Sequence, residues 1–71
     1  MKLEEAYGKL LKEYRQKKNL SQEQLAFESG LDRTYISMLE RGKRQPSLST
    51  IFSIAKSLNI KPSEFLEKLE E

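Results

Sequence analysis

The 71-residue chain contains no cysteine and no histidine. The first absence excludes disulfides and thiolate metal sites. The second removes the commonest general base, the usual zinc ligand and the side chain that titrates near neutral pH. Eleven Asp and Glu residues remain, but they are spread along what we interpret as solvated helix faces, where such charges are ordinary. We therefore expect no catalytic site, no metal and no cofactor.

Long apolar runs are also missing. No stretch approaches membrane-spanning length, and residues 1–5 lack the apolar core of a signal peptide. This pattern predicts a cytoplasmic protein. A chain of 71 residues is close to the lower size at which one hydrophobic core maintains a fold. We expect a single domain over residues 1–71.

The charges are unevenly distributed, although the net charge is only +2. Residues 1–20 hold six Lys or Arg against three acids, and residues 33–44 hold four against Glu40 alone. Residues 59–71 reverse the balance, with four Glu against two Lys. A basic middle and an acidic end suggest that one face meets a polyanion. Ordinary charge scatter on a soluble helical protein explains the composition equally well.

The apolar residues from Leu3 to Tyr14 recur at the spacing of an amphipathic helix, which Lys17–Lys18 and then Asn19 should close. No alternating apolar run and no Asn-Gly hairpin signal occurs, so no strand is expected.

The next two helices each have a start and a stop signal. Ser21 and Gln24 have the spacing of a capping box, which predicts a helix over about residues 22–28 that stops at Gly30. Asp32 is a strong N-cap for a third helix, which should end at Gly42. Two short helices joined by a short turn that contains Gly are typical of a helix-turn-helix, here at about residues 21–42.

Two more helices complete the expected fold. Ser47 should cap a fourth helix that ends at Asn59, and a fifth has Pro62 at its first position. Lys61 is a poor cap for that last helix. The sequence thus predicts an all-α fold of five short helices. We expect the buried side of the fourth helix to consist of Leu48, Ile51, Phe52, Ala55 and Leu58.

The outward face of the third helix has the composition of a DNA-reading surface. Arg33, Ser37 and Arg41 form one line at i+4 steps, beside Thr34 and Met38. In helix-turn-helix proteins the N-terminal residues of the second helix touch base edges in the major groove. Arg33 can bond the O6 and N7 atoms of guanine, and Thr34 can contact a thymine methyl group or a phosphate. For Arg33 taken alone, a solvated helix face is the simpler explanation.

Neighbouring residues favour DNA contact. Gln22 begins the second helix, whose positive end suits a phosphate. Arg41, Lys43 and Arg44 follow the third helix and can hold the DNA backbone on its other side.

Glu40 lies four residues after Ile36 and so faces partly inward, where an unpaired carboxylate is costly. Arg15 occupies the inner side of the first helix. We expect a partly buried Arg15–Glu40 pair between the first and third helices. The alternative is that both side chains reach solvent.

Residues 21–47 resemble the Xre, or Cro/cI-repressor-type, helix-turn-helix family, and the later short helices extend the resemblance over nearly the whole chain. It implies a lambda-repressor-like fold. Residues 31–37 are similar to those of the controller proteins of restriction–modification systems, which are small homodimers that regulate their own promoter and the endonuclease gene. Many stand-alone Xre regulators share the same run. The resemblance rests on Ser21, Gln22, Leu25, Ala26, Gly30, Ile36, Ser37, Glu40, Gly42, Pro46, Ser47 and Leu48.

The resemblance also implies roles for particular residues. It implies phosphate contact at Gln22, backbone contact at Lys43 and Arg44, and the Arg–Glu pair. Family members often carry a polar reader where this chain has Met38. The resemblance implies base or phosphate contact at Arg33, Thr34, Tyr35 and Ser37.

Family members without an extra domain usually dimerise through their last helices, which implies that residues 48–69 serve both core and dimer. Phe65 and Leu66 can instead pack on the chain's own core. The partners implied are a second copy of the chain and double-stranded DNA with an inverted-repeat operator, with RNA polymerase as a further candidate. The expected dimer contacts are Ile60, Phe65, Leu66 and Leu69.

A DNA-binding transcription regulator is thus the leading prediction. An antitoxin-like or other protein-interaction subunit on the same fold is the alternative. Such a subunit would not need the basic face of Arg33, Arg41, Lys43 and Arg44, so their presence favours the regulator.

Overall fold

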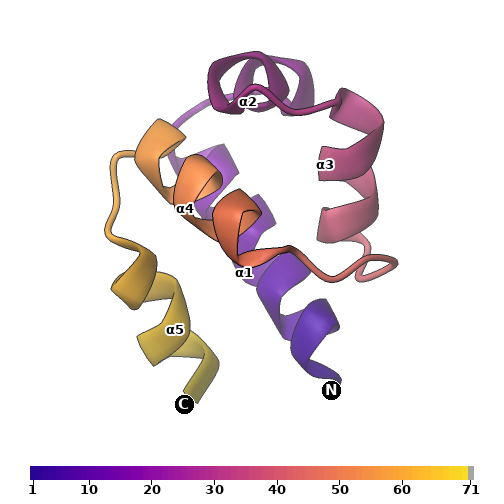
Figure 1. Cartoon of the computed structure of the whole chain (residues 1–71), viewed down its shortest axis with the longest axis vertical. Helices are drawn as coiled ribbons and strands as arrows, with labels where there is room; N and C mark the ends of the chain where they lie inside the picture. The colour runs from indigo at the N-terminus through magenta and orange to yellow at the C-terminus, as the bar shows by residue number, and fades with distance from the viewer. Residues whose placement is uncertain (71) are drawn as a thin grey trace.

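The structure, a computed structural model, describes residues 1–70, which form five α-helices and no strand (Figure 1). The predicted all-α, helix-turn-helix architecture is confirmed. The helices are α1 (Leu3–Lys17), α2 (Gln22–Ser29), α3 (Arg33–Glu40), α4 (Leu48–Ser57) and α5 (Pro62–Glu70).

The helices begin where side chains satisfy the first free N–H groups. The Ser21 hydroxyl accepts from the Gln24 N–H at 3.0 Å, and the Gln24 side chain accepts from the Ser21 N–H at 2.8 Å, so the predicted capping box is present. The Asp32 carboxylate caps α3 by accepting from the Thr34 N–H at 3.2 Å. At α5 only half of a capping box is present: the Glu64 side chain accepts from the Lys61 N–H at 3.1 Å, and a lysine side chain has no acceptor for the N–H groups of the first turn.

The first four helices all end in the same way. Each runs into a left-handed residue, and the residue after it donates its N–H back to a carbonyl five positions earlier, as in a Schellman motif. The lengths of these bonds range from 2.9 to 3.1 Å. Four consecutive helices can therefore be short and still change direction sharply. The left-handed residues are Asn19 and Asn59, both at φ 58°, and Gly30 and Gly42, both at φ 71°.

The core lies where α1 crosses the centre of the molecule and contacts α3 on one side and α5 on the other (Figure 1). The Phe65 ring packs between two tyrosines of α1, 5.2 Å from Tyr7 and 5.1 Å from Tyr14 between ring centres. α1 also approaches the end of α3 closely, because Gly8 lies against the carbonyl groups of Leu39 and Glu40. The close approach at Gly8 fixes the position of α3 relative to α1.

One expectation about α4 was wrong. Phe52 and Leu48 were expected on its buried side, but they are 56% and 71% exposed. The buried side is centred on Ile54 and Leu58, which are both fully buried. Each residue turns a helix by about 100°, so Phe52, two positions before Ile54, faces nearly the opposite way.

None of the helices in residues 1–70 is both long and apolar enough to span a bilayer.

Candidate nucleic-acid interface

The second helix of the helix-turn-helix presents its first turn to solvent. Ile36 and Leu39 are fully buried and fix α3 to the core, while Arg33 and Thr34 at its start are exposed. Ser37 is half-buried on the next turn and Arg41 is exposed. In Figure 1, α2 and α3 lie at one side of the molecule, away from α5. The predicted face is therefore exposed at both ends and half-buried at Ser37 between them.

Arg15 and Glu40 form a bidentate ion pair between α1 and α3. Arg15 Nε lies 2.6 Å from one carboxylate oxygen of Glu40, and Arg15 Nη2 lies 3.1 Å from the other. The two side chains are only 11% and 3% exposed. Arg15 Nη1 also donates to the Leu20 carbonyl oxygen at 2.7 Å. The pair thus ties α1, the following turn and the end of α3 together.

This pair also determines the electrostatics of the face. Glu40 is the only acid within residues 33–44, and its charge is buried against Arg15. The cations of the same segment, by contrast, all lie exposed at the surface: Arg33, Arg41, Lys43 and Arg44.

Gln22 connects the buried pair to Arg33. Its amide nitrogen donates to Glu40 at 3.0 Å, so its amide oxygen points the other way and accepts from Arg33 Nη1 over a long 3.4 Å. The sequence reasoning assigned Gln22 to a phosphate and missed this link. Nothing in the local pattern signals it, because Gln22 and Glu40 are 18 residues apart.

Tyr35 and Arg44 lie together beside the start of α4. The Tyr35 ring is half-buried, and its hydroxyl is 3.4 Å from the Thr50 hydroxyl, which itself accepts from the Ser47 cap at 2.9 Å. The Arg44 guanidinium lies 5.5 Å from the centre of the Tyr35 ring, within cation–π range. Tyr35 therefore positions the loop arginine.

Arg41 and Lys43 differ in how firmly they are held. Arg41 Nε donates to the Ser37 carbonyl oxygen at 3.3 Å, which lays its side chain along the end of α3. Lys43 is exposed at the start of the loop. Both lie near the exposed end of α3.

The residues expected at a dimer contact do not share one environment. Leu66 is 49% exposed, and Ile60 and Leu69 are half-buried. Phe65 follows the alternative stated for it: it is fully buried in the chain's own core, where its ring packs against two tyrosines of α1. An exposed residue that the sequence reasoning missed, Phe52, borders the same shallow groove as Ile60.

No group of three or more acidic side chains within residues 1–70 is arranged to hold a metal ion. A helix that is fixed to the core and exposed at its start, preceded by a helix of equal length and a tight turn and followed by exposed cations, is the arrangement of a helix-turn-helix DNA-binding protein. A model of the helix-turn-helix family matches residues 11–65. The chain belongs to this family.

Several similar proteins are described as control or controller proteins. The control protein C.BamHI of Bacillus amyloliquefaciens is 47% identical over 86% of this chain and 76% of its own length. The crystal structure of the restriction-modification controller protein C.AhdI from Aeromonas hydrophila is 48% identical, covers 87% of this chain and 94% of its own, and superposes with a TM-score of 0.86. The controller protein C.Esp1396I, solved as a tetramer with its natural 35-base-pair operator, is 36% identical over 99% of this chain and 92% of its own, with a TM-score of 0.88.

Proposed function

We propose that this protein is a sequence-specific DNA-binding transcription regulator that acts as the controller protein of a restriction–modification system. The observation that carries the proposal is the exposed basic face on and after α3, whose only acid is neutralised within the core. Its similarity to three controller proteins supports the narrower assignment. A binding face of this kind has no need of catalytic groups, and the protein would act in the cytoplasm.

The proposed division of roles follows from position on the face. Arg33 and Thr34, at the start of α3, are the readers of base edges, with Ser37 one turn further. Lys43 and Arg44 contact the phosphate backbone. The backbone N–H groups at the start of α2 can bind a phosphate even while the Gln22 side chain is held by Glu40. Tyr35 acts on Arg44 through its ring and can itself contact the DNA.

A dimer is part of the proposal, because one recognition helix reads too few base pairs to select a site in a genome. Two copies related by a two-fold axis would place two recognition helices about 34–36 Å apart on an inverted-repeat operator. Leu66 and Ile60, together with the exposed Phe52, supply apolar surface for such a contact. RNA polymerase is a further partner that a promoter-bound regulator can contact.

A protein-interaction subunit, such as an antitoxin, is the second candidate. Its support is Phe27, an aromatic side chain on α2 that is 87% exposed and has no part in the DNA-reading face. The salt dependence of binding to random duplex DNA separates the two functions. A regulator that neutralises several phosphates loses affinity steeply with added salt, whereas a protein-binding subunit has no such affinity to lose.

The decisive experiment compares two variants on two DNAs. Footprinting on the chain's own upstream DNA first locates the operator. Arg33→Ala should then cost about 1–3 kcal/mol on the operator and relax discrimination at one base pair. Lys43→Ala should weaken operator and random DNA alike and lower the salt slope by about one. Lys68→Ala on α5 is the matched control and should leave both affinities unchanged. Equal losses on both DNAs for Arg33→Ala would show that Arg33 does not read bases.

Sedimentation tests the dimer. The wild-type protein should sediment as a dimer at micromolar concentration, and Leu66→Glu should shift it to a helical monomer that binds the operator weakly. Because Leu66 is 49% exposed, this substitution spares the core. A wild-type monomer that bound the operator without cooperativity would contradict this part of the proposal.

A further inference from the structure

Met38 is a half-buried apolar side chain on α3 that does not belong to the core. Within residues 1–70 every half-buried leucine, isoleucine and tyrosine packs against the buried core, whereas Met38 does not. The phase of the helix explains the difference. Ile36 and Leu39 define the buried side of α3, and each residue turns a helix by about 100°, so Met38, two positions after Ile36, faces nearly the opposite way. Its apolar surface therefore lies on the outward face.

On that face Met38 lies among the residues proposed to meet DNA. It comes one turn after Thr34 and three residues before Arg41, both of them exposed, and residues at these spacings are neighbours on a helix surface. Helical side chains lean toward the N-terminus of the helix, so Met38 extends back toward Thr34 and the first turn. The Lys43 N–H donates to the Met38 carbonyl oxygen at 2.9 Å, so the loop proposed to contact phosphate is joined to the same turn.

A methionine side chain can recognise only the apolar part of a base edge. Its thioether has no hydrogen to donate and its sulfur is a weak acceptor, so it is a poor partner for the amino, carbonyl and ring-nitrogen groups of the bases. The apolar group that the major groove offers is the C5 methyl of thymine. An unbranched side chain with three rotatable bonds adapts its shape to that group. A cytosine at the same place would lose the apolar contact and leave its amino group against sulfur, without a good acceptor.

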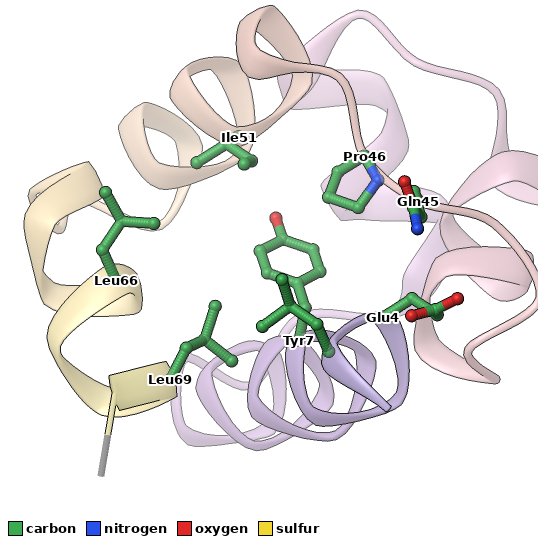
Figure 2. A pocket seen from close by; sticks show the side chains of 8 residues that line it. Glu4, Tyr7, Gln45, Pro46, Ile51, Leu66 and Leu69 are labelled. Carbon is green, nitrogen blue, oxygen red and sulfur yellow. The ribbon is translucent and has the colours of Figure 1, made fainter. Parts of the chain in front are cut away.

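We propose that Met38 contacts the C5 methyl group of one thymine in each half of the operator, which makes it a specificity-determining residue of the DNA-reading face. The inference rests on the proposed function, because it requires α3 to lie in the major groove. Arg33 then reads a base by hydrogen bonds, and Met38 reads one by its apolar surface. This surface is separate from the proposed dimer contact, since Leu66 and Leu69 border the hollow between α1, α4 and α5 (Figure 2) and Met38 does not.

The test removes one methyl group at a time from the DNA. The operator that footprinting defines is synthesised with deoxyuridine in place of each thymidine of one half-site in turn, because uracil pairs as thymine does and lacks only the methyl group. Binding of the full chain is measured by fluorescence anisotropy. We expect one position at which the substitution weakens binding about fourfold, the value of burying one methyl-sized group. At that position Met38→Ala should bind the thymine and uracil operators equally, and Met38→Leu should keep the difference.

Thr34→Ser is the matched control, because it removes the methyl group of the neighbouring side chain and keeps its hydroxyl. This variant should retain the difference between thymine and uracil. If Thr34→Ser abolishes the difference and Met38→Ala does not, Thr34 reads the methyl group and the proposal is wrong. A wild-type protein that is indifferent to uracil at every position would also overturn it, in a comparison that needs no variant. In both cases the footprint of the wild-type protein, and with it the proposed function, would stand. A chain that protects no DNA at all would refute both.

Discussion

Removing one member of the Arg15–Glu40 pair should destabilise the fold far more than removing an ordinary surface charge. In Arg15→Met the carboxylate of Glu40 loses both guanidinium bonds and stays in a site where the side chain is 3% exposed. Stranding a buried charge in this way costs roughly 3–5 kcal/mol. We expect the lower end, about 3 kcal/mol, because Gln22 still donates to the same carboxylate.

The opposite variant should cost less. In Glu40→Gln the Arg15 guanidinium keeps its bond to the Leu20 carbonyl oxygen and is 11% exposed, so part of its charge remains solvated. We expect a loss of about 2 kcal/mol for this variant, within the range for a charged hydrogen bond. The double variant should lose less than the sum of the two single variants, by about 2 kcal/mol, because neither charge is then stranded.

Urea unfolding of the four proteins measures this coupling. Domains of this size are stable by roughly 3–10 kcal/mol, so the single variants should show a clearly lower midpoint. Glu13→Gln is the matched control, because Glu13 is an exposed acid of α1, and it should change the free energy of unfolding by no more than about 0.5 kcal/mol. A coupling indistinguishable from zero would mean that both charges are solvated in the native protein and that the pair has no structural role.

Three further predictions concern other parts of the fold. Gly8→Ala should lower the free energy of unfolding measured in urea by about 1–3 kcal/mol, although alanine is the better helix former. The new Cβ would meet the Leu39 carbonyl oxygen and lie 2.8 Å from the Glu40 carbonyl oxygen. A stabilised variant would refute the close approach of α1 and α3. Gly30→Asn should cost less than Gly30→Val in thermal unfolding, since the added side chain meets open space and only the φ of 71° is strained. Because burial raises the pKa of Tyr7 in the folded chain, its contribution is present below the unfolded pKa of about 10 and lost as the pH rises above it. The stability difference between wild type and Tyr7→Phe should therefore be constant up to that pH and shift against the wild type beyond it.

The helix boundaries could be predicted from the sequence because their causes are local. A serine with a glutamine three residues later satisfies backbone N–H groups of its own turn. A glycine after the last apolar position ends the helix by adopting a left-handed conformation. Neither signal needs a distant contact. The same reasoning placed Arg33 and Thr34 on an outward face, since the phase of a helix follows from its buried residues. This succeeded for α3, where Ile36 and Leu39 define the phase.

Prediction failed for side chains whose burial depends on which other helix packs against them. Phe52 and Phe65 are both aromatic residues on amphipathic helices. The sequence analysis placed Phe52 in the core and left Phe65 open between a dimer contact and the core. In the structure Phe65 enters the space between two tyrosines of α1, while Phe52 faces solvent. Periodicity shows which residues share a face, but it does not show which other helix covers that face.

The polar link through Gln22 has a consequence for how the proposed DNA-reading surface of this chain is built. Glu40 accepts from Arg15 on the core side and from Gln22 on the DNA side, so one buried carboxylate orients both. Because the Gln22 amide nitrogen is bound there, its oxygen is presented to Arg33, which lies at the edge of the proposed base-reading surface. The Gln22 amide nitrogen carries a second hydrogen, so a phosphate can accept from Gln22 while the bond to Glu40 and the contact with Arg33 stay in place. We therefore expect the Gln22 side chain to remain on Glu40 when DNA is bound.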